Sequence, residues 1–432
     1  MKRITALSFV FLIVVCFAAF AGGGSQGSAG SKEAPVLFNW TWDQAKSEAM
    51  VAAYNSSHAN TPLKSDEIII AAQDYLPKLQ QTFASGGRLP DILSAEMGQR
   101  GALYSMDIWE RLDAAPYNLD TSIFIDAVVG GMKNAKGEVI ALENALNPAG
   151  MAYKRDLAKQ YLGTDDPAKL EAMFKDYDAY SKLGAEVYKN SGGKVTLFIG
   201  LRDVADMMSR QVRNISNLDA GGNVNVSGKM RRIFSVVKSV QTNHGAGNIV
   251  SGTPAWNAAI GQKAFIFFPC ASWAPKYQIV PNDPNGKGNW GIFIPAGGPY
   301  GSGGTSMGLA KTTKYKKEVY DFLFWTYTSK SAAEALKKEQ DMFLPVKSLY
   351  VDPSYATGTT EWFSSQDLFK ILYVDLAPVV PPPAITVYDN MVTDSMNMVL
   401  DSLNADSSLS VEKMMDMFMK DLQQKIQDKK VL

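Results

Sequence analysis

The stretch NWGIFIPAGGPYGSGGTSMGLA, residues 289–310, changes physical character within a few residues. An apolar, strand-like run at 290–295 leads into a segment with five glycines, and a second short apolar run follows at 306–310. Glycine has no Cβ, so a backbone this rich in glycine bends at little steric cost, as a crossing between two lobes requires. The stretch predicts a hinge near residue 305. A surface turn between two strands of one sheet is the alternative that it leaves open.

Length and composition favour a globular protein of two or three domains. The chain has 432 residues, of which 46% are hydrophobic, so large cores can be buried. Lys plus Arg equals Asp plus Glu at 43 each. Proteins that bind nucleic acid show a basic excess or a basic stripe, so no nucleic-acid partner is expected.

The N-terminus has the pattern of a secretory signal peptide. A positively charged start precedes an apolar run at 6–20 that ends in Ala-Phe-Ala, and the run is too short for a confident membrane-spanning helix. Residues 1–21 are therefore expected to be cleaved, with 22–34 a flexible leader and the mature chain exported. Lipid attachment at Cys16 is a disfavoured alternative, because the residues beside it are larger than such a site prefers.

Cysteine and histidine are too scarce for most of their usual chemistry. Cleavage would leave Cys270 as the only cysteine, and its apolar context predicts a buried, inert thiol. His58 and His244 are the only histidines and lie far apart in the sequence, so neither a histidine metal site nor a catalytic triad is predicted. We expect no cofactor, no metal and no catalytic residue, although a metal site built from carboxylates alone stays open.

The start of the mature chain alternates between strand and helix patterns. Strands are expected at 36–40, at 67–71, where three isoleucines predict a strand covered on both faces, and at 89–93. Helices are expected between them, the first capped by Asp43 and the second ended by Gly86. This order favours an α/β lobe with a mostly parallel sheet.

Later segments predict a second set of elements. Residues 166–183 predict one long helix, since their apolar positions keep a helical period. The other elements expected here are strands at 195–199 and 264–268, helices at 204–215, 319–327 and 410–428, and a loop at 219–230.

Five motifs in order resemble those of the extracellular solute-binding proteins of ABC importers, in particular the carbohydrate-binding family that includes maltose-binding protein. The segment ASGGRLPDIL at 84–93 resembles the family's SG-x-x-PD passage. The other four are KGEVIAL at 136–142, MAYKRDL at 151–157, AFIFFPCASW at 264–273 and GGTSMGLA at 303–310.

The resemblance implies an α/β, two-lobed periplasmic-binding-protein fold of type II. Each lobe would be a mostly parallel sheet flanked by helices, with the ligand in the cleft between lobes. The first lobe would hold 35–142 and 306–344 and the second 143–305 and 345–432, with crossings near 142 and 305. The function implied is capture of a mono- or oligosaccharide and its delivery to the transmembrane subunits of an ABC permease. The protein would be a periplasmic or extracellular monomer and no enzyme.

Most candidate ligand-binding residues follow the expected strands, because ligands of open α/β sheets lie beyond the carboxyl ends of strands. Trp256 would cover the cleft or anchor a loop, and Tyr300 lies in the glycine crossing. The resemblance implies that the segment with Tyr388 returns to the cleft. A pyranose offers apolar faces that stack on aromatic rings and hydroxyls that pair with polar side chains. Trp273 is the strongest candidate, since it follows a strand and matches the family's Ser-Trp pair. Core packing is the alternative for the tryptophans, and helix capping for the polar residues. The full set is Trp40, Trp42, Glu96, Glu143, Asn144, Asn147, Trp256, Trp273, Tyr300 and Tyr388.

Other functions stay open on the sequence. Another small solute, such as a glycerol phosphate, an amino-acid derivative or a peptide, would suit the same fold. A secreted glycoside hydrolase would need two paired carboxylates, and no such pair is identifiable from spacing. A chemoreceptor adaptor or a surface adhesin would use the same lobes. The sequence has no G-x-x-x-x-G-K-[ST] loop, so ATP hydrolysis would belong to a separate subunit.

Overall fold

The computed structural model describes residues 34–363 and 365–432, and residues 35–432 form one compact unit. The predicted signal peptide, Cys16 and most of the predicted leader lie outside the described residues. Among the helices that the model describes, none is both long and apolar enough to cross a membrane.

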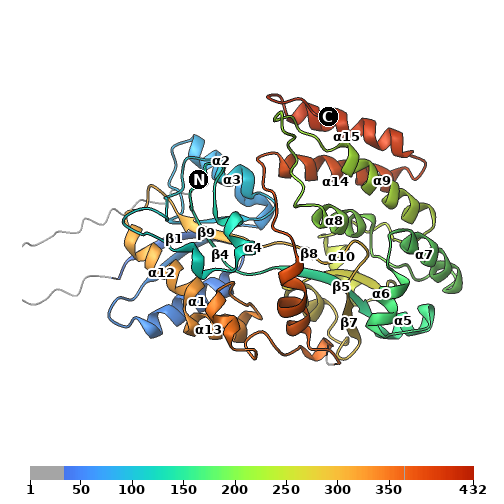
Figure 1. Ribbon diagram of the computed structural model, residues 1–432, viewed down its shortest axis with the longest axis horizontal. Helices are drawn as coiled ribbons and strands as arrows, with labels where there is room; N and C mark the ends of the chain where they lie inside the picture. The colour runs from blue at the N-terminus through green and yellow to red at the C-terminus, as the bar shows by residue number, and fades with distance from the viewer. Residues whose placement is uncertain (1–33, 364) are drawn as a thin grey trace, which may run out of the picture. The chain divides into compact units, whose positions relative to one another are not determined.

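The first sheet has five strands in the order β2-β1-β3-β9-β4 (Figure 1). β1 pairs in parallel with β2 and β3, whereas β9 runs antiparallel to both β3 and β4. β9 therefore lies between two strands that come much earlier in the chain. The bounds are β1 (Val36–Thr41), β2 (Lys64–Ile69), β3 (Ile92–Glu96), β4 (Leu142–Glu143) and β9 (Thr305–Leu309).

The second sheet has four strands, with β6, β7 and β8 all paired antiparallel to β5. The prediction of a mostly parallel sheet in each lobe is wrong here. The segment 195–199, predicted as a strand, forms only isolated bridges, and the two that Thr196 and Phe198 make are parallel. The bounds are β5 (Pro148–Lys154), β6 (Phe267–Ala271), β7 (Trp290–Phe293) and β8 (Tyr300–Gly301).

The glycine-rich stretch crosses from the second sheet to the first. β8 belongs to one sheet and β9 to the other, so residues 302–304 join them, and residues 144–147 make the opposite crossing. Gly303 and Gly304 have φ angles of 78° and 108°. A Cβ at Gly303 would lie 2.7 Å from Trp273 Nε1, and one at Gly304 would lie 2.8 Å from Asn147 Nδ2. Both positions therefore require glycine, for backbone conformation and for space.

Helices cover both sides of the first sheet, with α1, α12 and α13 on one side and α2 and α3 on the other (Figure 1). As predicted, Asp43 caps α1, where its side chain accepts a hydrogen bond from the backbone of Lys46 at 3.1 Å. The prediction that Ile68 and Ile69 lie on a covered strand is wrong. They are 45% and 56% exposed, because β2 is the edge strand of the sheet. The bounds are α1 (Gln44–Ser57), α2 (Ala72–Ala84), α3 (Arg100–Tyr104), α4 (Asp126–Val129), α12 (Lys316–Thr328) and α13 (Lys330–Gln340).

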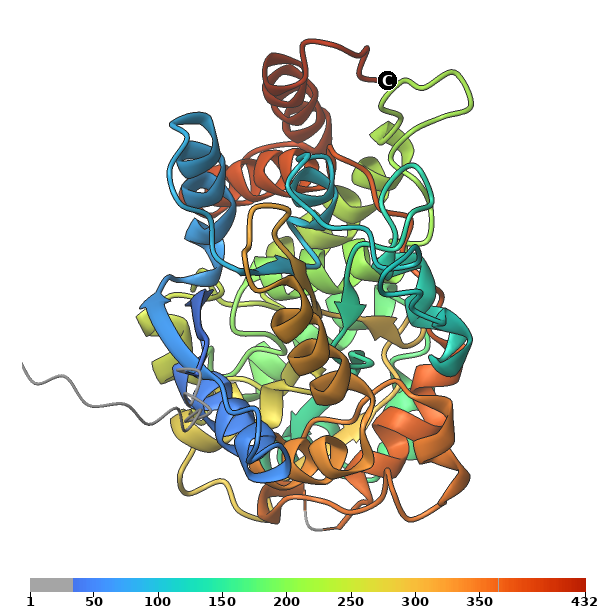
Figure 2. The same ribbon diagram turned by 90° about the vertical axis from the view of Figure 1, so that its left-hand side faces the viewer.

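The helices around the second sheet include two at the C-terminus, α14 and α15, which pack against each other, and α15 also packs against α9. The red C-terminal helices lie at the top of both views (Figure 1 and Figure 2). The long helix predicted at 166–183 is wrong. It is interrupted after Met173, and the side chain of Asp176 accepts a hydrogen bond from the backbone of Ala179 at 3.1 Å as the next helix begins. The bounds are α5 (Arg155–Leu162), α6 (Pro167–Met173), α7 (Asp178–Asn190), α8 (Leu201–Gln211), α9 (Ser227–Thr242), α10 (Pro254–Ile260), α11 (Val280–Asn282), α14 (Asp389–Ala405) and α15 (Val411–Lys425).

Short 3-10 and π-helical turns complete the described chain. They are η1 (Thr121–Ile123), η2 (Gly130–Met132), η3 (Pro275–Ile279), η4 (Lys347–Val351), η5 (Glu361–Phe363), η6 (Lys370–Leu376) and η7 (Ala377–Val379). Cys270 is fully buried on β6, as predicted, and burial raises the pKa of its thiol.

Gly308 on β9 is a position where any side chain would meet backbone. A Cβ there would lie 2.3 Å from the carbonyl oxygen of Ile140. We expect Gly308→Ala to lower the free energy of unfolding by about 1–3 kcal/mol, since the strand must shift to make room. Gly130 is the control, because its φ is −61° and nothing lies within 4 Å of its Cβ position. Gly130→Ala should stabilise by roughly 0.4–1 kcal/mol. Equal effects in urea unfolding would contradict this packing.

Candidate functional site

An open groove of about 1450 Å³ lies between residues of the two sheets and their helices. From the first-sheet side it is lined by α2 and by the segment after β3, which includes Glu96 and Gln99. From the second-sheet side it is lined by the end of α8 and by α14. Ser302 and Gly303, from the glycine crossing, also line it. The groove is therefore bordered by both sheets' elements and by the crossing that joins them.

Trp273 is the aromatic side chain that lines this groove among the described residues. It is half-buried and follows directly after β6. Its indole N–H donates a hydrogen bond to the carbonyl oxygen of Ser302 at 2.9 Å, and its edge lies against Gly303. The nitrogen is thus satisfied and the ring is held in one orientation, as a stacking platform requires.

Glu96 borders the groove at the end of β3. One carboxylate oxygen accepts a hydrogen bond from the backbone N–H of Gly98 at 2.6 Å. A Cβ at Gly98 would lie 2.9 Å from that oxygen, so a larger residue there would displace the carboxylate. The carboxylate is therefore held at the groove by its own loop.

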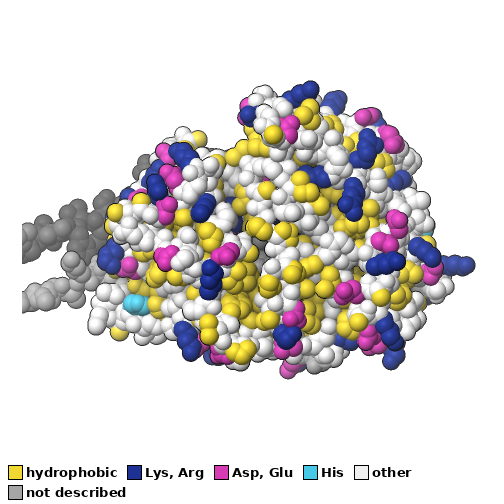
Figure 3. Space-filling view, viewed as in Figure 1, with side chains coloured by type: hydrophobic (Ala, Val, Ile, Leu, Met, Phe, Trp, Pro, Cys, Tyr) yellow, Lys and Arg dark blue, Asp and Glu magenta, His cyan; other side chains and the backbone are white. Residues whose placement is uncertain are grey.

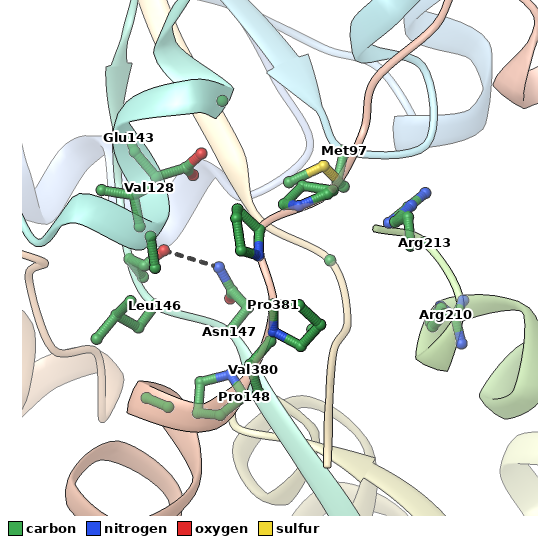
Figure 4. Close-up of a pocket in the computed structure, with 18 of the residues that line it drawn as sticks. Met97, Val128, Glu143, Leu146, Asn147, Pro148, Arg210, Arg213, Val380 and Pro381 are labelled. Carbon is green, nitrogen blue, oxygen red and sulfur yellow. Dashed lines mark hydrogen bonds between the residues drawn. The ribbon is translucent and has the colours of Figure 1, made fainter. Parts of the chain in front are cut away.

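A second cavity of about 670 Å³ shares Arg210, Arg213 and Gly303 with the groove. Figure 4 shows Glu143, Leu146 and Asn147 on one side of it and the two arginines on the other, with Pro381 between them. The segment Val380 to Pro383 thus runs along this cavity.

Glu143 is 3% exposed and lies in a buried ion pair. Its Oε2 is 2.6 Å from Arg100 Nη1, and it accepts a second hydrogen bond from the hydroxyl of Ser306 at 3.0 Å. Its Oε1 has no hydrogen-bond partner among the described residues. Asn147, also on this cavity, donates a hydrogen bond to the carbonyl oxygen of Ala145 at 3.0 Å (Figure 4).

Asn144 joins the two crossings to each other. Its side-chain oxygen accepts a hydrogen bond from the backbone N–H of Thr305 at 3.2 Å, and its backbone N–H donates to the carbonyl oxygen of Thr305 at 3.2 Å. The first bond occupies the side-chain oxygen, and Asn144 lines neither of the two cavities described above.

The tryptophans near β1 lie elsewhere. Trp40 is 3% exposed and packs edge-on against Phe38 and Tyr75 in the core. Trp42 is half-buried and lines a separate cavity of about 590 Å³ beside α1 and α12. Core packing, the alternative weighed for these tryptophans, therefore accounts for Trp40.

Trp256, Tyr300 and Tyr388 are buried and line none of these cavities. The indole N–H of Trp256 donates a hydrogen bond to Asp203 Oδ1 at 3.1 Å, and burial raises the pKa of that carboxyl to about 6. Tyr300 is 1% exposed, and the hydroxyl of Tyr388 donates a hydrogen bond to Asp428 at 2.7 Å. Trp256 therefore joins α10 to α8, and Tyr388 anchors the C-terminal segment.

The structure thus brings Glu96 and Trp273 together at the groove, and Glu143 and Asn147 together at the second cavity. Arg210 and Arg213, which line both, were not predicted. Their signal is two arginines three residues apart at the end of an expected helix. That signal also suits simple stabilisation of a helix C-terminus by positive charge, so by sequence alone it does not indicate a site.

On the face shown in Figure 3, charged side chains lie mostly toward the rim and hydrophobic side chains gather around the middle.

Comparison with solved structures identifies the fold. No family model and no curated protein matches the chain. A crystal structure described as an extracellular solute-binding protein of family 1 is 18% identical, with a TM-score of 0.77 over 90% of this chain and 99% of that chain. The galacto-N-biose/lacto-N-biose I-binding protein of a Bifidobacterium longum ABC transporter, solved with lacto-N-biose, is 15% identical, with a TM-score of 0.73 over 92% and 98%.

A third solved structure is the ABC-transporter-associated binding protein of B. animalis subsp. lactis in complex with beta-1,6-galactobiose. It is 14% identical, with a TM-score of 0.72 over 91% of this chain and 98% of that chain. The chain therefore has the two-lobed periplasmic-binding-protein fold of type II, and this prediction is confirmed.

Proposed function

We propose that this chain is the substrate-binding component of an ABC importer, which captures a carbohydrate in its groove and delivers it to the transmembrane subunits of a permease. Its lobes would be 35–142 with 306–344, and 143–305 with 345–432. The protein would act as an exported monomer in the periplasm or outside the cell, after cleavage of residues 1–21.

The observation that carries this proposal is the groove with Trp273 in its lining. A half-buried indole whose N–H is already bonded leaves its ring for the apolar face of a pyranose. Around it lie side chains that donate and accept hydrogen bonds, as sugar hydroxyls require. The structural neighbours support the same ligand class, since two of them are named for lacto-N-biose and galactobiose.

A contact between the proposed lobes supports closure around a ligand. The hydroxyl of Tyr277, in the turn that follows Trp273, lies 2.7 Å from Asp43 Oδ2 and 2.7 Å from Gln340 Oε1. Asp43 caps α1 and Gln340 ends α13, both on the first sheet, whereas Tyr277 lies in η3, which follows β6 of the second sheet. Such a polar contact forms or breaks when lobes move about a glycine-rich crossing.

A thermal-shift screen of residues 22–432 tests the function. The panel holds mono- and oligosaccharides, with amino acids, short peptides, polyamines and glycerol phosphate as controls. A sugar present at about 100 times its Kd should stabilise the folded state by roughly 2.7 kcal/mol and raise the Tm. A shift given only by a non-sugar would contradict the carbohydrate class. Release of products from any glycan in the same samples would contradict binding without turnover.

A further inference from the structure

Two arginines, Arg210 and Arg213, line the groove and the cavity beside it. Arg210 lies in the last turn of α8, and Arg213 lies two residues beyond the end of that helix. Figure 4 shows both side chains on the same side of the cavity. Burial, followed by the positive charge of Arg210, lowers the pKa of Arg213. The two guanidinium groups are therefore within electrostatic reach of each other.

The charge of Arg213 is not matched by a bonded partner in the described part of the chain. Arg210 forms an ion pair with Asp206, which lies one helical turn earlier, and its guanidinium is 3.6 Å from that carboxylate. Among the described residues, no hydrogen bond or ion pair joins the guanidinium of Arg213 to another side chain, and Glu96 and Asp389 act on it only through their charge. Two guanidinium groups lie beside one cavity, and that of Arg213 has no bonded partner among the described residues. Such an arrangement favours an anion between them.

Two carboxylates that line the groove, those of Glu96 and Asp389, have hydrogen-bond partners. Glu96 accepts a hydrogen bond from the backbone of Gly98 at 2.6 Å. Asp389 accepts from the side chain of Asn217 at 2.7 Å and from the backbone of Thr386 at 2.9 Å. These bonds occupy one oxygen of Glu96 and both oxygens of Asp389, and neither carboxylate is bonded to Arg213.

Stabilisation of the helix by positive charge accounts for Arg210 but not for Arg213. Charge near a helix C-terminus acts mainly within the last turn. Arg213 lies past Val212, the residue that caps α8, and its side chain lines the groove. Helix stabilisation therefore does not account for its position at the groove.

We propose that the groove selects an acidic sugar, a saccharide with a carboxylate, sulfate or phosphate group. The anion would bind to Arg213 and Arg210 while a sugar ring stacks on Trp273. Gly303 lies between the two parts of this site. It lines both cavities together with the arginines, and it lies against the indole edge of Trp273. Guanidinium groups suit such anions because they offer two parallel N–H donors. This inference rests on the proposed function.

Calorimetric titration of residues 22–432 with matched sugar pairs tests the inference. The pairs are glucuronate with glucose, galacturonate with galactose, mannuronate with mannose, and the disaccharides built from each. Glucose 6-sulfate and glucose 6-phosphate distinguish the anions. We expect the acidic member of one pair to bind at least tenfold more tightly than its neutral counterpart, and its affinity to fall as salt screens the charges.

Arginine variants assign the selectivity to the proposed residues. Arg213→Gln should weaken binding of the acidic sugar by ten- to a hundredfold and leave the affinity for its neutral counterpart within about threefold. Arg231→Gln removes the same charge from α9, where Arg231 is exposed beside Glu412 at 3.7 Å, and should change neither affinity. The Tm of each variant without sugar shows whether it folds.

Each outcome bears on a different statement. Equal or tighter binding of the neutral member in every pair would overturn the acidic-sugar inference and leave the proposed carbohydrate function in place. Equal losses of both members in Arg213→Gln would overturn the role of that arginine in selecting charge. Failure of every saccharide to bind, with a folded protein, would overturn the inference and the proposed function together.

Discussion

Replacing Trp273 with alanine is expected to weaken sugar binding by about 30-fold or more while the protein stays folded. A buried aromatic anchor at the centre of a binding site contributes about 2 kcal/mol or more, and each 1.4 kcal/mol is a tenfold change in Kd. The side chain is only half-buried in the free protein and lines an open groove, so its removal leaves most of the core intact. Calorimetric titration with the sugar found in the thermal-shift screen measures the change.

Two matched variants make this result specific. Trp42→Ala removes another half-buried indole, but one that lines the cavity beside α1 and α12, and should leave the Kd within a few-fold. Trp273→Phe keeps an aromatic face and loses the bond to Ser302, so its Kd should lie between those of wild type and Trp273→Ala. If Trp42→Ala weakened sugar binding as much as Trp273→Ala, the assignment of the site to the groove would be contradicted.

Replacing Arg100 with leucine is expected to lower the free energy of unfolding by about 3–5 kcal/mol. Arg100 and Glu143 are both buried and lie 2.6 Å apart, and the arginine also bonds to backbone carbonyls of Ala95 and Gly131. Loss of one partner leaves an uncompensated buried charge, which costs more than the loss of the contact itself. Urea unfolding measures the change.

A double variant separates the buried charge from the lost packing. Arg100→Met together with Glu143→Leu removes both charges and should recover most of the loss, because well-packed apolar residues replace a buried ion pair at little cost. Arg111→Leu is the surface control. Arg111 is exposed, and its partner Asp113 lies 2.7 Å away. Loss of this surface pair should lower the free energy of unfolding by about 1 kcal/mol or less. A double variant as unstable as Arg100→Leu would refute the explanation by unpaired charge.

Sequence patterns predicted those parts of the fold that depend on local chemistry. The cap at Asp43, the end of α2 near Gly86 and the apolar period of α15 act within one helical turn, and all three predictions are confirmed. The direction of pairing to β5 and the exposure of β2 depend on which strands become neighbours in the sheet. An apolar run such as that at 67–71 contains no information about its neighbours, so the edge position of β2 was not predictable from it.

Only part of the candidate site was predictable from the sequence, because the burial of a side chain also depends on which elements become neighbours. Position after a strand predicted Glu96 and Trp273, and both line the groove. It did not distinguish them from Trp40, which is buried, since burial depends on which face of the sheet is covered. Arg210 and Arg213 were not predicted because they lie at the end of a helix and reach the groove only through the packing of α8.

The position of β9 in the first sheet constrains the order in which the protein can form. A ribosome delivers β3 and β4 early, yet β9, the strand that must lie between them, is made only after the whole second sheet has been synthesised. Until then β3 is paired only with β1, and β4 has no partner in the sheet. Contacts between such distant segments also make folding slow. The first sheet therefore cannot be completed until Thr305–Leu309 has been made, so the nascent chain stays partly unfolded through most of its synthesis.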